Sequence, residues 1–479
     1  MSDPMPPCPD AVFLAALRAI VGDTHVLTDD HDVEPFLHDW RGYASGRAAA
    51  VVFPADTDQV SRVVALAAQA GRNIVPQGGN TGLSQGAVPS DDGRGIVLGL
   101  RRMTAIPEID TPSGVLLAEG GATLSAVHDA ARAVDRRVPL SLGSEGTAQI
   151  GGLVSTNAGG IGALRYGPMR DLVCGLEVVL PDGRVFRDLR ALRKNNTGYD
   201  LRNLFIGAEG TLGIVTTVAL RMQPVLRAAA HAWIALADLD AAVTILAGLQ
   251  ERFDTAVQAA ELLSGPQVDL VLQHIPRTRH PLESRPEWSL LIELGSTDAD
   301  ADLRGRLEDW LADRFEEGTL TDAFIAQNEA QAAAIWHLRH SVSEANKLHG
   351  HSLSHDVAVR PSRLPQMIRD CTDAVLQAHP GATILIVSHL GDGNVHFIVH
   401  FTHDAWARLS DPAGVTRDVM ARVHDATEAL GGTFSAEHGI GRKLRQELAA
   451  RVDPVRMGLM QDIRAVIDPD RRMNPGAVL

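Results

Sequence analysis

The chain has 479 residues, of which 45% are hydrophobic, and its 59 acidic and 44 basic residues give a net charge of −15. This length is more than one hydrophobic core organises, so two or three domains are expected, and the composition excludes a disordered chain. The negative charge argues against nucleic acid or an anionic membrane as the main partner.

The cysteines and the first residues bear on the cellular compartment of the protein. Cys8, Cys174 and Cys371 have no pair spacing, which predicts no thiolate metal site and a reducing compartment. The opening MSDPMPPCPD has neither the charged nor the apolar region of a signal peptide, and no apolar run reaches the length of a membrane span. We expect a soluble, cytoplasmic protein.

Strand and helix patterns alternate from about residue 49 to 225. Expected strands cover residues 48–54, 72–76, 95–100, 114–122 and 212–224, a hairpin covers 175–186, and helices cover 58–70 and 122–134, the second capped near Thr123. Beyond Pro224 glycine becomes rarer, and residues 300–317 place Leu303, Leu307, Trp310 and Leu311 on one helix face. We therefore expect a domain boundary near residues 224–230.

Two glycine-rich stretches are candidates for a phosphate-binding site. The first is Gly78-Gly79-Asn80-Thr81-Gly82, and the second, residues 141–167, holds eight glycines. Glycine lets backbone N–H groups approach and face an anion, although either stretch alone could also be an ordinary set of tight turns. Neither is a P-loop, and the Gly207 to Gly213 stretch lacks the Rossmann spacing.

Four segments in order, PQGGNTG, GTAQIGGLVSTNAGG, ALRYGPMRDLVCGLEVVLPDG and NNTGYDLRNLFIGAEGTLGIVT, resemble the FAD domain of the vanillyl-alcohol-oxidase or PCMH-type flavoproteins. The resemblance implies a two-subdomain FAD-binding domain and FAD as cofactor. The implied FAD contacts are Pro76, Gly78, Gly79, Asn80, Thr81, Gly82, Gly143, Gly151, Gly152, Asn157, Gly160, Tyr166, Gly167, Gly210 and Ile214. Some relatives attach the flavin through a histidine of the first loop, where this chain has Gly79 and Asn80, so we expect non-covalent FAD.

The stretch SHLGDGNVHF predicts a hairpin with a histidine on either side of its turn. On one straight strand His389 and His396 would point to opposite faces, but a hairpin about Gly391-Asp392-Gly393 can bring them to one face. A zinc-like site needs a third ligand, and SAEHGIG offers Glu437 as ligand and His438 as base. From these residues alone, an idle turn and a solvated Glu-His pair remain open.

Both stretches, followed by Asp468-Pro469 and Asn474-Pro475-Gly476, resemble the C-terminal domain of FAD-linked D-2-hydroxy-acid dehydrogenases, which include D-2-hydroxyglutarate, D-lactate and glycolate enzymes. The resemblance implies a divalent metal, zinc in the first place, held by His389, His396 and Glu437. It also implies His438 as catalytic base. The implied substrate-binding residues are Arg339, Ser343, His389, His396 and His438, with Ser343 one helical turn after Arg339.

Two positions depart from the hydroxyglutarate-type pattern. Ser354, two residues before Asp356, stands in place of a lysine, and Ile398, two residues after the second histidine, stands in place of an asparagine. Both changes remove polar contacts and favour a smaller or more apolar acid than 2-hydroxyglutarate. Residues that could compensate are Lys347, His349, His351 and His355.

The fold class implied is α+β, with a PCMH-type FAD domain, an α+β substrate domain built on an antiparallel sheet, and a helical C-terminal region. The expected parts are an N-terminal helical segment 1–48, an FAD domain 49–225, a substrate and metal domain 226–430, and a segment 431–479 that completes the active site and docks on the FAD domain.

The function implied is oxidation of a D-2-hydroxy acid to a 2-oxo acid by a flavin-dependent dehydrogenase. The expected electron acceptor is an electron-transfer flavoprotein or a quinone, no nucleic acid is bound, and a homodimer is an option. The alternatives are a flavoenzyme of the same fold acting on another alcohol and a non-catalytic FAD-binding subunit. The His-Glu-His set argues against the first alternative, and Arg339 with His438 argues against the second.

Overall fold

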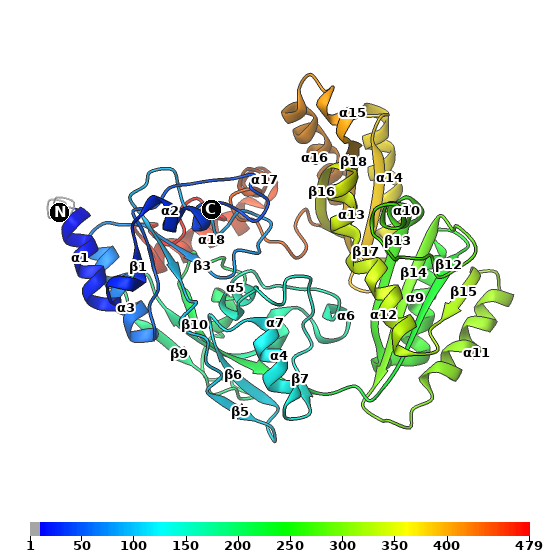
Figure 1. Ribbon diagram of the computed structural model, residues 1–479, viewed down its shortest axis with the longest axis horizontal. Helices are drawn as coiled ribbons and strands as arrows, with labels where there is room; N and C mark the ends of the chain where they lie inside the picture. The colour runs from blue at the N-terminus through cyan, green and yellow to red at the C-terminus, as the bar shows by residue number, and fades with distance from the viewer. Residues whose placement is uncertain (1–9) are drawn as a thin grey trace. The chain divides into compact units, whose positions relative to one another are not determined.

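The computed structural model describes residues 10–479 and divides into two compact units (Figure 1). The first unit holds the chain through Gly159, Gly167–Val225 and His438–Leu479. The second holds Gly160–Tyr166 and Leu226–Glu437. Residues 1–9, with Cys8 and nearly all of the opening MSDPMPPCPD stretch, lie outside the described part.

The first sheet of the first unit is mostly parallel. Its strands, in the order β1-β2-β4-β3, are β1 (Val26–Leu27), β2 (Ala50–Val52), β3 (Ile74–Gln77) and β4 (Ile96–Gly99). Helices α1 (Asp10–Val21) and α3 (Thr57–Gln69) share one hydrophobic core with it. Helix α3 begins where Asp56 accepts a hydrogen bond from the Gln59 N–H, and it buries Val60, Val63, Val64 and Ala67, as its spacing predicts.

The second sheet of the first unit is antiparallel. Its strands, in the order β5-β6-β10-β8-β9, are β5 (Glu108–Asp110), β6 (Val115–Glu119), β8 (Val173–Val179), β9 (Val185–Asp188) and β10 (Ile214–Arg221). The β8–β9 pair is the expected hairpin. Shorter elements are α2 (Asp30–Val33), α4 (Leu124–Arg132), β7 (Arg136–Arg137), α5 (Ile150–Ser155), α7 (Met169–Leu172), α8 (Arg202–Phe205) and β11 (Gln223–Pro224). Thr123 caps α4 through its side-chain oxygen, as expected.

The C-terminal segment returns to the first unit. Beyond α17 (Arg445–Arg451) and α18 (Pro454–Ile467), the chain pairs with β3, where the Ile74 N–H donates to the Arg472 carbonyl and the Asn474 N–H to the Ile74 carbonyl. The Arg464 guanidinium is buried and donates to the Met473 and Ala477 carbonyls. The tail is thereby fixed by backbone pairing and by one buried cation.

The second unit is built on a seven-stranded antiparallel sheet in the order β15-β12-β14-β13-β17-β18-β16. Its strands are β12 (Ala228–Leu236), β13 (Val257–Ser264), β14 (Trp288–Ser296), β15 (Leu320–Ile325), β16 (Gly350–Ala358), β17 (Thr383–His389) and β18 (Asn394–Thr402). Its helices are α6 (Ala163–Tyr166), α9 (Ala241–Phe253), α10 (Gly265–His274), α11 (Leu303–Glu316), α12 (Glu329–His340), α13 (Val342–His349), α14 (Leu364–Ala378), α15 (His403–Ala407) and α16 (Pro412–Ala429).

Each face of this sheet has its own hydrophobic core. One face packs against α9, α11, α14 and α16 through residues such as Phe397 and Val399. The other face, with Leu385 and Ile398, packs against α10, α12 and α13. Because side chains alternate along a strand, His396 lies on the same face as Ile398 and therefore on the face covered by α12 and α13.

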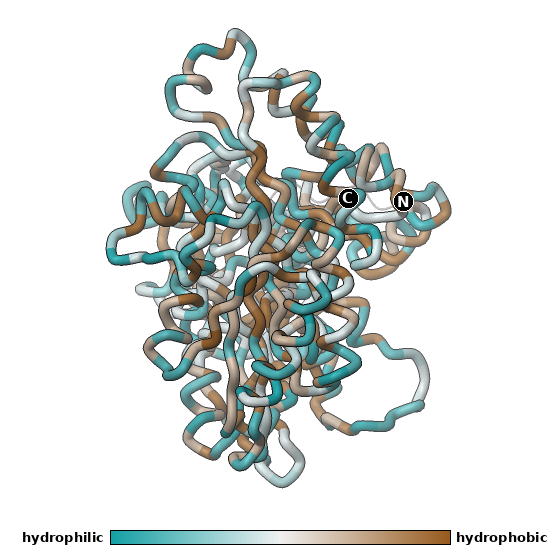
Figure 2. The backbone as a smooth tube through the Cα atoms, turned by 90° about the vertical axis from the view of Figure 1, so that its right-hand side faces the viewer, coloured by the Kyte–Doolittle hydropathy of each residue, from teal (hydrophilic) through white to brown (hydrophobic). Residues whose placement is uncertain are grey.

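The expected α+β class is confirmed. Hydrophobic and hydrophilic stretches follow one another closely along the backbone (Figure 2). Within residues 10–479, no helix has the length and apolar character needed to cross a membrane.

Candidate active site

The two histidines of the β17–β18 hairpin lie on one face of the sheet. His389 pairs with Asn394 and His396 pairs with Val387, so the histidines are diagonal neighbours. Their ring centroids lie 5.5 Å apart at an interplanar angle of 80°. The predicted hairpin is present, and it brings together two imidazoles that stand seven residues apart.

The turn of this hairpin requires glycine at position 393. Gly393 has a φ of +79°, and an added Cβ would lie 1.9 Å from the Val359 carbonyl oxygen. Its own carbonyl accepts a hydrogen bond from the Val359 N–H at 3.1 Å. The backbone of the turn therefore lies directly against the end of β16.

Glu437 lies near the histidines, in a loop that runs alongside the edge strand β16. The Ala436 N–H donates to the Asp356 carbonyl at 3.0 Å, and the Glu437 N–H donates to Asp356 Oδ2 at 2.9 Å. Asn394 Nδ2 donates to the other carboxylate oxygen of Asp356 at 2.9 Å. The buried Asp356 carboxylate thus connects the Glu437 loop to the start of β18.

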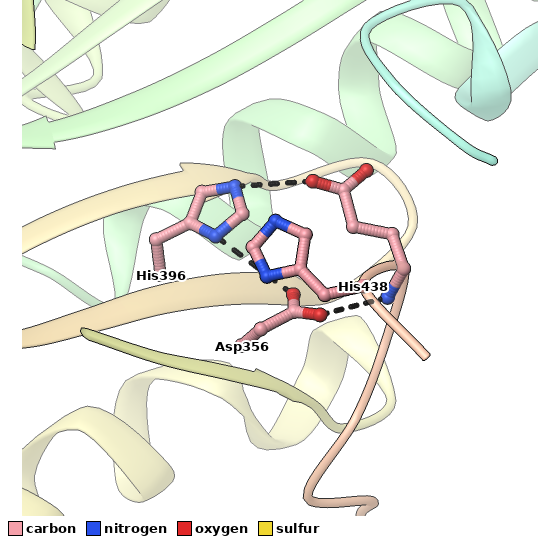
Figure 3. A group of neighbouring side chains, drawn as sticks. Asp356, His396 and His438 are labelled. Carbon is pink, nitrogen blue, oxygen red and sulfur yellow. Dashed lines mark hydrogen bonds and ion pairs between the residues drawn. The ribbon is translucent and has the colours of Figure 1, made fainter. Parts of the chain in front are cut away.

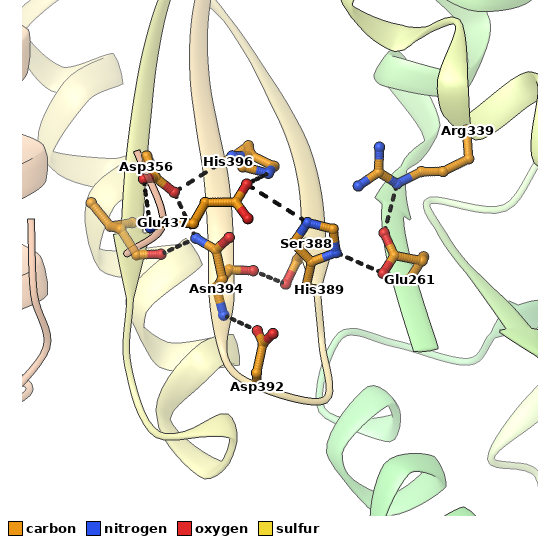
Figure 4. Close-up of polar contacts among 10 residues, drawn as sticks. Glu261, Arg339, Asp356, Ser388, His389, Asp392, Asn394, His396 and Glu437 are labelled. Carbon is orange, nitrogen blue, oxygen red and sulfur yellow. Dashed lines mark hydrogen bonds and ion pairs between the residues drawn. The ribbon is translucent and has the colours of Figure 1, made fainter. Parts of the chain in front are cut away.

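The Glu437 carboxylate lies near both predicted histidine ligands. Glu437 Oε1 lies 3.5 Å from His396 Nε2 and 3.9 Å from His389 Nε2 (Figure 4). Ligand atoms about 2.0–2.1 Å from a tetrahedral zinc stand about 3.3 Å apart, so the distance between Glu437 Oε1 and His396 Nε2 is close to that between two zinc ligands. Asp356 belongs to the same cluster, since its carboxylate lies within 4.8 Å of ligand atoms of His396 and Glu437 (Figure 3). His438, also drawn in Figure 3, is the next residue of the chain.

A buried carboxylate that the sequence did not single out connects this cluster to Arg339. Glu261, on β13, is 1% exposed and accepts from His389 Nδ1 at 2.7 Å. Its other oxygen accepts from Arg339 Nε, also at 2.7 Å (Figure 4). A lone glutamate within the apolar stretch VQAAELLS was the available signal, because a charged side chain is rarely buried without partners.

The charges of the cluster favour a cation. Glu261, Asp356 and Glu437 supply three carboxylates, and Arg339 is a permanent cation beside Glu261. Burial opposes ionisation of Glu261, but His389 and Arg339 outweigh it and hold its pKa below the usual range. Burial also opposes protonation of His389, yet the Glu261 carboxylate raises the pKa of His389 to about 9. A divalent ion is the natural replacement for that proton.

The expected single helix through Arg339 and Ser343 is wrong. Helix α12 ends at His340, Ser341 caps it, and α13 begins at Val342. Arg339 is largely buried against Glu261, whereas Ser343 lies on the new helix and is exposed. Ser341 and Val342, at the junction of the two helices, are buried. A role for Ser343 in substrate binding stays a prediction.

The residues that could compensate for Ser354 and Ile398 lie in different places. Ser354 pairs with Ile398, directly beside the Asp356–His396 pair and on the same face. His351 and His355 lie on the other face of β16. There His351 stacks on Trp406, and His355 makes an edge-to-face contact with the His424 ring. His349 remains, stacked on His400 with ring centroids 5.2 Å apart. Lys347 is exposed on α13.

In the first unit, the two glycine loops lie together. An added Cβ on Gly79 would lie 1.8 Å from the Thr147 carbonyl oxygen, so the first loop passes directly over the second. Among the described residues, no N–H from Gly78 to Gly82 donates a hydrogen bond. A cavity of about 260 Å³ lies along Gly78, Gly79 and Asn80. Free N–H groups beside a cavity suit a pyrophosphate, so the loop fits the FAD diphosphate.

The other predicted FAD contacts are distributed unevenly. Gly210 lies against Pro76. Ile214 is 2% exposed and packed in the core of the first unit, so only its backbone can face a ligand. Gly160 and Tyr166 belong to the short segment that clusters with the second unit, where the Tyr166 hydroxyl donates to Gln258 at 3.2 Å. Their contact with FAD stays a prediction.

Within the first unit, the backbone around His438 is tightly held. Ser84 Oγ donates to the His438 carbonyl at 2.8 Å. The buried Glu209 carboxylate accepts from the Ile440 and Gly441 N–H groups, each at 2.7 Å. Burial raises the pKa of Glu209, against the pull of these two N–H groups. The residues after the predicted base are therefore fixed by the segment that carries the Gly207–Gly213 motif.

Two family models match this chain. Residues 48–188 match the FAD binding domain, and residues 226–478 match the C-terminal domain of FAD linked oxidases. The chain belongs to the family of FAD-linked oxidases. It is an oxidoreductase with an FAD-binding domain, as its glycine loops and C-terminal motifs predict.

Curated relatives match nearly the whole chain. Mitochondrial D-2-hydroxyglutarate dehydrogenase of Arabidopsis thaliana is 34% identical over 98% of this chain and 82% of its own length. The Bos taurus enzyme of the same name is 32% identical, with 97% and 83% covered. D-2-hydroxyglutarate dehydrogenase of Xanthomonas citri pv. viticola is 31% identical, with 97% and 96% covered.

Solved structures share the fold at low identity. An alkyldihydroxyacetonephosphate synthase has a TM-score of 0.74 and 16% identity over 98% of this chain and 86% of its own. A p-cresol methylhydroxylase with substrate bound has a TM-score of 0.74 and 18% identity, with 98% and 96% covered. These likenesses describe the fold and leave the reaction open.

Proposed function

We propose that this protein oxidises a D-2-hydroxy acid to the 2-oxo acid. The observation that carries the proposal is the group on one sheet face of the second unit: His389, His396 and Glu437 converge, and Arg339 is joined to His389 through Glu261. A 2-hydroxy acid has a carboxylate and a hydroxyl on adjacent carbons, which match an arginine and a metal-binding cluster. The curated relatives carry names of enzymes for such acids.

The residues of the chain have separate roles in this proposal. The Arg339 guanidinium binds the substrate carboxylate with its Nη groups while Nε stays on Glu261. His389, His396 and Glu437 hold the metal, and His438 accepts the hydroxyl proton. When bound, FAD accepts the hydride from carbon 2 at its N5, and a divalent metal, zinc in our proposal, polarises the 2-hydroxyl oxygen. Non-covalent attachment of the FAD is part of the proposal.

The substrate is a smaller or more apolar acid than 2-hydroxyglutarate. Next to the Asp356–His396 pair, Ser354 pairs with Ile398, whose side chain is 5% exposed and packed in an apolar cluster with Leu385. A second carboxylate on the substrate would meet no lysine at this place. An alkyl side chain needs no such partner.

The reduced flavin passes its electrons to an electron-transfer flavoprotein or a quinone in our proposal. A cytoplasmic location and a homodimer complete it. Oxidation of the reduced enzyme by a purified electron-transfer flavoprotein or a water-soluble quinone, compared with air, separates these acceptors.

Anaerobic mixing of the FAD-loaded enzyme with matched D- and L-2-hydroxy acids tests the function. The flavin absorbance should bleach with D-acids of short or apolar side chains, more slowly with D-2-hydroxyglutarate, and not with L-acids. If no D-acid bleaches the flavin, the proposed function is wrong, and simple alcohols and phenols are the next compounds to add.

A further inference from the structure

Glu261 lies between two groups that both donate hydrogen bonds. One oxygen faces His389 Nδ1 and the other faces Arg339 Nε, each at 2.7 Å (Figure 4). The carboxylate is 1% exposed, and the Arg339 side chain is 12% exposed. Water does not compete for either contact, so the geometry of this pair of bonds is fixed by the protein.

The bond to His389 determines which ring nitrogen can bind a metal. An ionised carboxylate only accepts hydrogen bonds, so Nδ1 of His389 carries the hydrogen. Nε2, which lies 3.9 Å from Glu437 Oε1, is then the nitrogen that can lose its proton and offer a lone pair to a metal. Carboxylates that hold metal-binding histidines in this way orient the ring and strengthen the ligand.

The bond to Arg339 determines how the guanidinium is presented. Glu261 takes Nε–H, and among the described residues the Nη groups of Arg339 make no hydrogen bond to the protein. Those Nη groups form the fork that binds a carboxylate with two parallel hydrogen bonds. One buried side chain thereby sets the direction of both groups.

From this arrangement we infer that Glu261 is a positioning residue that couples the metal site to the substrate-carboxylate site. It orients the His389 ring toward the metal and the two Nη groups of Arg339 toward the substrate carboxylate. Because one side chain holds both groups, the distance between them is also fixed. The inference rests on the proposed function, because it assigns Arg339 and His389 the roles given there. Only a carboxylate has two acceptor atoms for these two donors, since an amide would turn its NH₂ group toward one of them.

The test compares Glu261→Gln with Glu293→Gln. Glu293 lies on β14 of the same sheet and accepts a hydrogen bond from Trp336 Nε1 on α12 at 2.9 Å. It is therefore a control glutamate with a donor on the same helix, partly buried and outside the candidate site. The first readout is the rate at which a chromophoric chelator removes Zn²⁺ from the purified FAD-loaded enzyme without substrate. We expect Glu261→Gln to lose Zn²⁺ about 10- to 100-fold faster and Glu293→Gln to match the wild type.

The second readout is the steady-state KM for the best D-2-hydroxy acid in the presence of excess Zn²⁺. We expect Glu261→Gln to raise KM at least tenfold through Arg339, an effect that restored metal does not remove. If Glu261→Gln does not fold, Glu261→Asp keeps both acceptors but shortens the side chain, and it should show smaller changes in the same two readouts.

Separate outcomes overturn the inference and the proposed function. If the wild type holds Zn²⁺ and is reduced by D-2-hydroxy acids, but a folded Glu261 variant matches it in Zn²⁺ loss and in KM, Glu261 has no positioning role. If the wild type binds no Zn²⁺, the coupling is overturned together with the metal assignment. If it binds Zn²⁺ but is reduced by no D-2-hydroxy acid, the proposed function falls, and Zn²⁺ retention alone still decides the role of Glu261 toward His389.

Discussion

At the residue scale, the site depends on carboxylates whose surroundings give them different roles. Glu437 is partly exposed and faces both histidines, Asp356 is buried and accepts from neighbouring N–H groups, and Glu261 is buried between two donors. The amino-acid type is nearly the same in each case. Exposure and hydrogen-bond partners distinguish a candidate ligand from a residue that positions one.

Replacement of His438 by glutamine should abolish turnover while FAD stays bound. Glutamine has no group that takes a proton at neutral pH, and loss of a general base typically costs a factor of about 100 to 10,000. Anaerobic stopped-flow measurement of flavin reduction checks this, with His31→Gln, an exposed histidine of α2, as control. Reduction at the wild-type rate would remove His438 from the mechanism.

A lysine at position 354 should shift the preference of the enzyme toward diacids. Ser354 lies beside Ile398 on the face of His396, so an ammonium there would meet a second substrate carboxylate. One added ion pair corresponds to about a tenfold gain in kcat/KM for D-2-hydroxyglutarate relative to a D-acid with an alkyl side chain. Thr383→Lys, an exposed position at the start of β17, adds the same charge elsewhere and should leave the ratio unchanged.

At the scale of elements, the β17–β18 hairpin and the edge strand β16 form the frame of the metal cluster. The hairpin aligns His389 with His396, and β16 holds the Glu437 loop through Asp356 and through the Ala358–Thr433 pairing. The ligands come from distant parts of the sequence, but each is held by backbone hydrogen bonds of the same sheet. This arrangement limits how far any one of them can move.

The Gly393→Ala substitution should destabilise this frame by about 2 kcal/mol or more. The new methyl group would collide with the Val359 carbonyl, and the φ of +79° is unfavourable for alanine. Urea denaturation measures the loss. Gly381→Ala is the matched control, because Gly381 lies just before β17 of the same hairpin and has no neighbour within 4 Å of an added Cβ. This variant should change the free energy of unfolding little. Equal stability of the two variants would contradict the strain argument.

At the scale of the whole molecule, each unit has its own cores and its own candidate ligand. The first unit has a core centred on residues such as Ile96 and Leu98 and carries the glycine loops. The second has two cores, one on each face of its sheet, and carries the histidine hairpin. The C-terminal segment from His438 onward belongs to the first unit although it follows the second in the chain.

The second unit also contains a group of histidines that should make stability depend on pH. His400 is 2% exposed, and burial, with smaller contributions from His349, His351, His403 and His274, lowers its pKa to about 4. In the unfolded chain it titrates near 6.5. Between these values the unfolded chain binds a proton that the folded one does not, so stability is present above about pH 6.5 and is lost as pH falls toward 4.

The slope expected from this one group is at most about 1.4 kcal/mol per pH unit. In the His400→Phe variant, which cannot titrate, the free energy of unfolding should fall less steeply between pH 6.5 and 4.5. Urea titrations at a series of pH values measure both slopes. The variant also loses the hydrogen bond between Ser352 Oγ and His400 Nδ1, which lowers its stability at every pH and leaves the slope comparison intact. Parallel slopes would show that His400 binds a proton equally in the folded and the unfolded chain.

The sequence by itself determined most of the elements and the candidate ligands, and its resemblance to known flavoproteins implied the α+β class and the FAD-binding domain. Hydrophobic periodicity and glycine spacing are local properties, and the hairpin with its two histidines is encoded in ten consecutive residues. The change of domain near residue 225 was visible as a change in composition. Resemblance to a family added Arg339, and it favoured the ligand and base roles of Glu437 and His438 over a solvated pair.

Only the tertiary structure decided how these residues are held. Glu261 lies 128 residues before His389 in the chain, and strand pairing between β13 and β17 makes them neighbours. Helix α12 ends before Ser343, and the face of β16 on which His351 and His355 lie turns both side chains away from Ser354. Strand register and burial arise from contacts distant in sequence, and local patterns do not contain them.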